Sequence, residues 1–119
     1  MHIALQPQEV EVFYILPAIR RELTIELKRL GKSQKEIARL LNVTESAVSQ
    51  YISAKRAGDV RFPDAIAKEI RAAAPRIEDY ETMVKEMQAI LAKGKEARFI
   101  CRMHERVADV PTGCDVCFR

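Results

Sequence analysis

Apolar residues recur at three- and four-residue steps along most of the chain, with charged residues between them, which is the pattern of amphipathic helices. Pro17 lies inside the first such run, residues 7–30. Because proline lacks an N–H and disfavours helical geometry at the preceding Leu16, we expect two helices that meet there, the second ending at Gly31. The predicted apolar side of this run consists of Val10, Phe13, Tyr14, Ala18, Ile19, Leu23, Leu27 and Leu30.

Two short helices separated by a tight turn are predicted next. Ser33 and Glu36 form a capping-box pattern, which begins a helix that stops near Asn42. Thr44 is the expected N-cap of the following helix, residues 44–56. The apolar positions of the two helices are Ile37, Ala38, Leu40 and Leu41 in the first, and Ala47, Val48, Tyr51 and Ile52 in the second.

The outward face of the second short helix is unusual. Most surface helices carry long charged side chains, whereas this one presents mainly short or planar hydrogen-bonding groups, which are the groups that read base edges in DNA. Its outward residues are Glu45, Ser46, Ser49, Gln50 and Ser53.

The segment from Gln34 to Ser53, QKEIARLLNVTESAVSQYIS, resembles the helix-turn-helix of the lambda-repressor-like regulators, also called the XRE type. Ala38 stands where this family needs a small residue at the helix crossing, and Val43, Val48 and Tyr51 stand at the apolar positions that lock the helices together. Asn42 replaces the usual glycine of the turn, and asparagine is the next best residue for a left-handed backbone. With its flanking helices the resemblance covers about residues 8–75, and the longer pattern with LPAIRREL is similar to a group of small predicted regulators from archaea.

The resemblance implies a transcription regulator that binds double-stranded DNA, with the helix from Thr44 in the major groove. Gln50 suits an adenine edge, and Glu45 suits either a cytosine amino group or the positive end of the helix dipole. The alternative is a helical hairpin that only packs in a core or contacts protein, with ordinary solvated charges. The predicted DNA contacts are Ser46, Ser49 and Gln50 as base readers, with Thr44, Glu45 and Ser53 beside them, and Gln34, Lys35, Lys55, Arg56 and Arg61 mainly at phosphates.

Two further helices are expected after the motif. Residues 62–70 carry Phe62, Ile66 and Ile70 one turn apart, and this helix ends before Pro75. The next helix begins at Glu78 or Asp79 and is expected to end at Gly94. Its predicted apolar side consists of Tyr80, Met83, Val84, Met87, Ile90 and Leu91, and its predicted polar side of Glu81, Lys85, Glu86 and Lys93.

The apolar side of this later helix fits either the core of the chain or a contact between two copies. We favour a homodimer, because a single helix-turn-helix reads only a short half-site and such regulators pair across a twofold axis. The predicted organisation is a helix-turn-helix DNA-binding domain over residues 1–75, followed over residues 76–119 by a dimerisation helix and a metal-binding tail.

All three cysteines lie in the last 19 residues. Cys101 and His104 are three residues apart on a predicted helix, and Cys114 and Cys117 follow the turn Pro111-Thr-Gly113, so the four side chains together offer a Cys3His metal site. The alternative is a free or redox-active cysteine pair with an unrelated histidine and a buried Cys101. Zinc and an iron–sulfur cluster both fit these ligands. The resembling archaeal regulators include members with a cysteine-rich C-terminus that looks like a cluster site, which favours a cluster without deciding between the two.

Composition and charge limit the fold and function classes that remain possible. The chain has 119 residues, of which 48% are hydrophobic, 31% charged and 6% aromatic, with no tryptophan, so we expect a globular all-α fold: a lambda-repressor-like bundle with a helical extension. The net charge is +3, but residues 17–61 hold ten basic and five acidic residues, which suits a phosphate-binding surface. No apolar run approaches the roughly 20 residues of a membrane span and the N-terminus lacks a signal pattern, so a cytoplasmic protein is expected.

Catalysis is not expected. The sequence has no glycine-rich phosphate loop, no recognisable Ser/His/Asp set and no strand-rich context around Cys114 and Cys117, so we predict neither an enzyme nor a small-molecule substrate. The second function considered is an antitoxin-like DNA-binding partner of a protein complex, with a purely structural zinc tail. Such antitoxins often carry a disordered tail, which contrasts with the ordered helices predicted for this chain.

Overall fold

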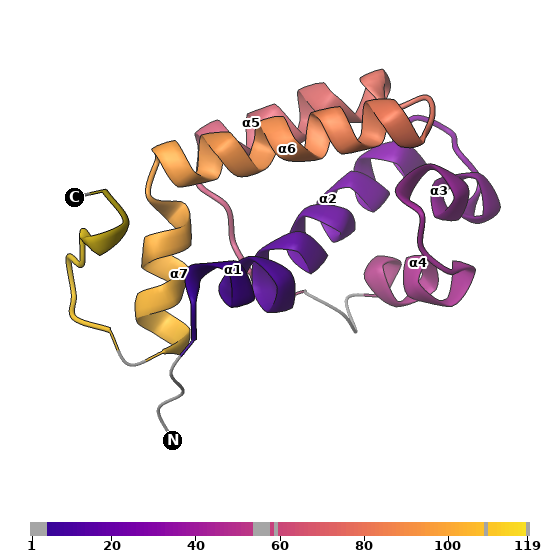
Figure 1. Cartoon of the computed structure of the whole chain (residues 1–119). Helices are drawn as coiled ribbons and strands as arrows, with labels where there is room; N and C mark the ends of the chain where they lie inside the picture. Colours follow the sequence, from indigo (N-terminus) through magenta and orange to yellow (C-terminus); the bar gives the residue numbers. More distant parts are fainter. Residues whose placement is uncertain (1–4, 54–57, 59, 109, 119) are drawn as a thin grey trace.

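The computed structural model describes residues 5–53, 58, 60–108 and 110–118, and these residues form helices and turns without a strand (Figure 1). The predicted all-α fold is therefore confirmed. The α-helices are α1 (Pro7–Val10), α2 (Leu16–Arg29), α3 (Gln34–Leu41), α4 (Glu45–Ile52), α5 (Asp64–Ala73), α6 (Tyr80–Glu96) and α7 (Phe99–Val107), and the other helical segments are η1 (Glu11–Ile15), η2 (Ala74–Arg76) and η3 (Val116–Phe118).

The helices α5 and α6 lie side by side along one edge of the molecule, and α2 runs below them (Figure 1). Helices α3 and α4 lie at one end of α2. Helix α7 lies at the other end, where it packs against α1. Helices α1 and α7 therefore meet at the end of the molecule opposite the helix-turn-helix (Figure 1).

The backbone stays helical through Pro17, where we expected two helices to meet. The segment η1 is π-helical, and α2 begins directly after it with Pro17 in its first turn. A π-helical segment advances the chain by an extra residue, so the apolar positions before and after it are out of phase. Ile15 is consequently buried, whereas Phe13, which the pattern placed on the apolar side, is 59% exposed.

The first long helix ends in a Schellman motif. Gly31 has a φ of +94°, its N–H bonds to the Lys28 carbonyl at 2.9 Å, and the Lys32 N–H bonds to the Leu27 carbonyl at 3.1 Å. The predicted end at Gly31 is confirmed. Leu30, which the pattern assigned to the apolar side, is exposed at this helix end.

Helix α6 differs from its prediction in four places. Val84, which the pattern assigned to the apolar side, is 37% exposed. Tyr80 is 64% exposed, since it stands in the first turn before the helix reaches the core. Glu86, assigned to the polar side, is buried, and its carboxylate lies 3.1 Å from the Arg76 guanidinium. The helix also continues through Gly94 to Glu96, and the chain turns at Arg98, whose φ is +58°.

One hydrophobic core runs through the whole described chain. It extends from Val10 in α1, through α2, α3 and α5, to Met103 in α7. Met83, Met87 and Ile90 of α6 are buried in it. These three residues of the apolar side of α6 therefore pack within the chain, and the contact between two copies stays a prediction.

Candidate nucleic-acid interface and the cysteine cavity

Local sequence signals determine where the two motif helices, α3 and α4, begin and how the turn between them is formed. The Glu36 N–H donates to Ser33 Oγ at 3.2 Å, which caps α3, and the Glu36 carboxylate lies 3.3 Å from Lys32 Nζ. Asn42 adopts the left-handed conformation, with φ 56° and ψ 47°, as expected for the turn. Thr44 Oγ1 then accepts from the Ala47 N–H at 3.0 Å and caps α4. Both predicted N-caps are confirmed, but the capping box at Ser33 is only half formed, because the Glu36 carboxylate pairs with Lys32 and does not reach back to Ser33.

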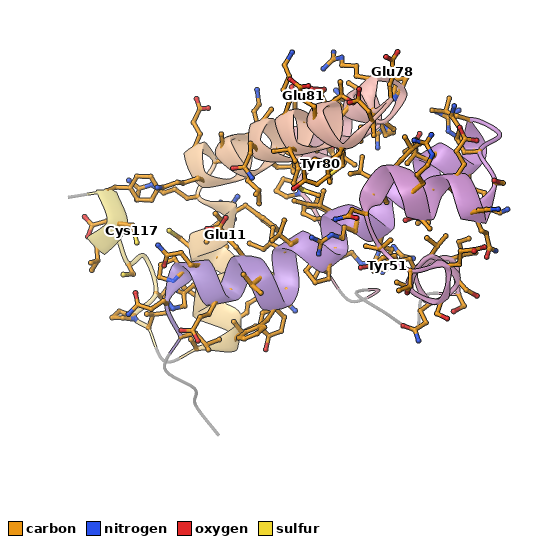
Figure 2. The ribbon with its side chains drawn as sticks, turned by 45° about the vertical axis from the view of Figure 1, so that its right-hand side comes forward. Glu11, Tyr51, Glu78, Tyr80, Glu81 and Cys117 are labelled. Atoms are coloured by element: carbon orange, nitrogen blue, oxygen red, sulfur yellow. The ribbon has the colours of Figure 1, made fainter. Side chains whose placement is uncertain are left out.

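The inner side of α4 is buried against α2 and α3. Ala47, Val48 and Tyr51 form this side, and Figure 2 shows Tyr51 on the side of α4 that faces α2. Ala38 of α3 is buried, and its carbonyl accepts from the Val43 N–H at 3.0 Å, which holds the turn. The angle of α4 relative to the rest of the domain is therefore set by packing on two helices.

The predicted reading positions of α4 lie away from its buried side. Ser46, Ser49 and Gln50 are exposed, as are Thr44, Glu45 and Ser53. The Ser53 hydroxyl donates to the Gln50 carbonyl at 3.2 Å, so it is engaged at the end of the helix. All six predicted residues of α4 and its caps are therefore exposed in the structure.

The predicted phosphate contacts are only partly within the described residues. Gln34 and Lys35 are exposed in the first turn of α3, and Arg61 is exposed before α5. Lys55 and Arg56 lie outside the described residues. Cationic and amide groups beside the exposed side of α4 are suited to hold DNA phosphates without reading sequence.

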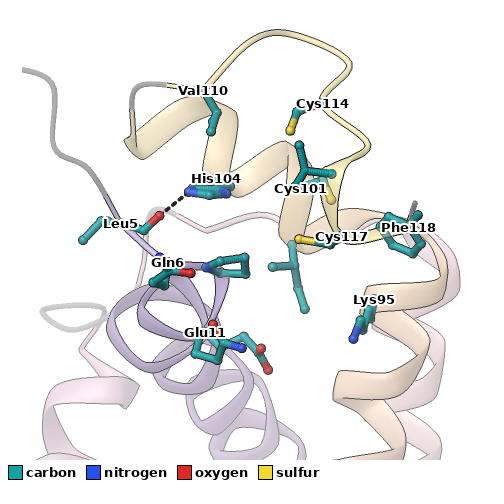
Figure 3. Close-up of a pocket in the computed structure, with 14 residues that line it drawn as sticks. Leu5, Gln6, Glu11, Lys95, Cys101, His104, Val110, Cys114, Cys117 and Phe118 are labelled. Atoms are coloured by element: carbon teal, nitrogen blue, oxygen red, sulfur yellow. Dashed lines mark hydrogen bonds between the residues drawn. The ribbon is translucent and has the colours of Figure 1, made fainter.

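The four predicted metal ligands line one cavity of about 380 Å³, at the end of the molecule away from α4 (Figure 3). Cys101 and His104 come from α7, and Cys114 and Cys117 from the tail. Figure 3 shows the cysteines on one side of the cavity and the N-terminal segment on the other.

Polar contacts hold the tail beside α7. The Gly113 N–H donates to the Glu105 carboxylate at 2.7 Å, and the Cys114 N–H donates to the Pro111 carbonyl at 3.2 Å, which forms the predicted turn. The Arg98 guanidinium lies 4.4 Å from the centre of the Phe118 ring. These contacts keep both tail cysteines at the cavity wall.

The Cys101 thiol is sensitive to its surroundings in the cavity. Burial raises the pKa of the Cys101 thiol, and the neighbouring thiols of Cys117 and Cys114 raise it further, while Arg98 lowers it. No group of three or more His, Cys, Asp or Glu side chains within the described part of the chain is arranged to hold a metal ion. The predicted ligands thus share a cavity and are chemically suited to a metal, but their side chains do not converge on one point.

The sequence did not predict the other wall of this cavity. It is formed by Leu5, Gln6, Pro7, Gln8 and Glu11 near the N-terminus, and Lys95 of α6 also lines the cavity. One local signal in this segment, besides Pro7 at the first helical position, is a capping box in which the Gln6 N–H donates to the Glu9 carboxylate at 2.9 Å. It marks a helix start and says nothing of a contact with residues near the C-terminus.

Comparison with known proteins locates the similarity in the motif. A family model described as "Helix-turn-helix" matches residues 25–59, which include the end of α2, all of α3 and all of α4. No curated protein and no solved structure matches the chain. None of the described helices is long and apolar enough to cross a membrane. Residues 25–59 are therefore similar to an XRE-like helix-turn-helix.

Proposed function

We propose that this protein is a sequence-specific transcription regulator that binds double-stranded DNA through the major groove. The observation that carries the proposal is the exposed polar side of α4, capped by Thr44 and fixed from behind by buried Val48 and Tyr51. An α-helix fits the major groove of B-DNA, and serine and glutamine side chains hydrogen-bond to base edges there. Ser46, Ser49 and Gln50 are the proposed base-reading residues.

The charged and amide residues around α4 are proposed to set its register on the duplex. Gln34 and Lys35 lie in the first turn of α3, where the positive end of the helix dipole also favours a phosphate. Lys55, Arg56 and Arg61, which follow α4 in the sequence, are proposed to contact further phosphates. Such contacts supply affinity that depends on salt and not on sequence.

We also propose that the protein binds its operator as a homodimer. One copy of α4 reads only a few base pairs, whereas two copies related by a twofold axis read two half-sites about 10 base pairs apart. Met83, Met87 and Ile90 of α6 are buried within the chain, whereas Tyr80 and Val84 of the predicted apolar side are exposed.

The cysteine cavity is proposed to hold a metal through Cys101, His104, Cys114 and Cys117. The support is the donor chemistry and the shared cavity: three thiols and one imidazole suit Zn²⁺ and also an iron–sulfur cluster. Bound zinc would cross-link the tail to α7, and a cluster would add redox sensitivity. Because these four side chains do not converge on one point in the structure, metal binding requires a rearrangement of the tail cysteines.

One selection experiment tests the proposed function. The full chain is incubated with a random pool of duplex DNA, once loaded with metal and once after removal of metal, and the bound DNA is sequenced. We expect enrichment of a motif with two half-sites about one helical turn apart. Bound DNA with the composition of the starting pool would overturn sequence-specific binding, and a single short site would overturn the homodimer.

The same preparation identifies the metal. Anaerobically purified protein that is brown and absorbs visible light holds a cluster, whereas colourless protein with one zinc per chain holds zinc. Protein with neither, after reconstitution with both, contradicts the metal site and leaves the DNA-binding proposal unaffected.

A further inference from the structure

The side chain of His104 joins the two ends of the chain. Its Nε2 atom lies 2.6 Å from the backbone carbonyl oxygen of Leu5, although 99 residues separate the two in sequence. A carbonyl oxygen only accepts hydrogen bonds, so the proton of the imidazole is on Nε2. In the neutral ring this leaves the lone pair on Nδ1, which is the atom that can bind a metal.

This arrangement is the one that metal-binding histidines use. A histidine ligand commonly donates its other ring N–H to a backbone carbonyl or a carboxylate, which fixes the ring and makes the ligating nitrogen more basic. We propose that His104 binds the metal through Nδ1 and that the Leu5 carbonyl supports it, so that metal binding clamps the N-terminal segment, residues 5–11, onto α7. This inference rests on the metal site proposed above.

The N-terminal segment is placed to respond to the metal. It forms the cavity wall opposite the cysteines, and α1 packs directly against α7. The segment is held locally by the Gln6–Glu9 capping box, and η1 continues it into α2 without leaving the helical conformation. Helix α2 also packs against α3 and α4. The N-terminal segment therefore connects the proposed metal site to α2, which supports the proposed reading helix α4.

The coupling between metal binding and docking of the N-terminal segment has to be reciprocal. If docking of the N-terminal segment strengthens metal binding by some factor, the metal strengthens docking of the segment by the same factor. Loss of a supporting contact to a histidine ligand typically costs about 10- to 100-fold in metal affinity. We therefore expect an effect of about 10-fold in both directions.

The experiment measures both directions on the full chain with Zn²⁺ as the probe. Zinc affinity is measured against a competing chelator for wild type, Leu5→Ala and Leu91→Ala. Leu5 and Leu91 are both partly buried against the core, but Leu91 does not line the cavity, so it controls for lost packing. Amide hydrogen exchange of residues 6–11 is measured in wild type and His104→Ala, with and without zinc.

Leu5→Ala keeps the backbone carbonyl but removes the side chain that packs the N-terminal segment against the core, so the carbonyl is held less firmly beside His104. We expect this variant to bind zinc about 10-fold more weakly and Leu91→Ala to bind as wild type does. We also expect zinc to slow exchange at residues 6–11 about 10-fold in wild type but not in His104→Ala. Zinc that binds wild type without slowing this exchange overturns the clamp, and the result does not require the Leu5 variant to fold. Absence of zinc binding overturns the clamp together with the metal site, while DNA selection reports separately on the regulator.

Discussion

Thr44 and Ala47 are joined by a 3.0 Å hydrogen bond from the Ala47 N–H to Thr44 Oγ1, so the N-cap side chain closes the first turn of the proposed reading helix. Thr44→Ala leaves this N–H without its partner, and we expect the free energy of unfolding to fall by about 1 kcal/mol. Urea titration measures this loss. Thr44→Ser keeps a hydroxyl acceptor and should retain wild-type stability, and a Thr44→Ala variant as stable as wild type would contradict the cap.

Base-reading and phosphate-binding residues should respond differently to substitution. Gln50→Ala removes an exposed amide from the proposed reading surface and should cost about 1–3 kcal/mol on the selected operator, with little change on random DNA. Lys35→Ala should weaken binding to both DNAs alike and reduce the slope of log K against log salt by about 1. Fluorescence anisotropy at several salt concentrations measures both quantities.

The comparison of these two variants tests the orientation of α4. Both residues are exposed at the surface, so neither substitution disturbs the core. Equal losses on operator and random DNA for Gln50→Ala would mean that Gln50 does not read bases, and the reading surface would have to be reassigned.

Asp79 should give α6 a pH-dependent stability. The Thr82 N–H donates to Asp79 Oδ1 at 2.8 Å and the Thr82 hydroxyl donates to it at 2.9 Å, and these bonds hold the pKa of Asp79 below its ordinary value. A carboxyl with a lowered pKa in the folded state stabilises the protein at pH values above its unfolded pKa, about 3.9, and loses that contribution as the pH falls through the folded pKa. Asp79→Asn keeps a capping oxygen without the charge.

We therefore expect the stability difference between wild type and Asp79→Asn to be constant near neutral pH and to shrink as the pH falls below about 4. Urea titrations across this range measure the difference, and carboxyl-carbon NMR gives the pKa directly. A difference that grows on acidification has the opposite sign and would exclude the capping role.

The motif helices were predictable because their signals are local. Ser33 and Thr44 cap helices within three residues of themselves, and Asn42 adopts the left-handed turn that its short polar side chain tolerates. The spacing of Val48 and Tyr51 then determines which side of α4 is exposed. The exposed surface of the candidate interface follows from these local signals alone.

The sequence-based predictions were wrong where the structure depends on contacts between distant residues or on the π-helical segment η1. The π-helical segment changes the helical phase, which moves Phe13 out of the core and Ile15 into it. Glu86 is buried because Arg76, ten residues away and beyond the helix, satisfies its carboxylate. The Leu5–His104 contact joins opposite ends of the chain, and no periodicity or spacing encodes such a pairing.

Gly94 offers a test of how far α6 extends. The sequence favoured a helix end at this glycine, whereas the structure continues the helix by two residues, and a methyl group added at Gly94 would meet no atom within 4 Å. Gly94→Ala should therefore stabilise the protein by about 1 kcal/mol, because alanine has the higher helix propensity. Gly31→Ala is the matched control: it also has open space, but its φ of +94° strains an alanine, so it should destabilise. Thermal unfolding of both variants gives opposite shifts if α6 passes through Gly94, and two downward shifts if the helix ends there.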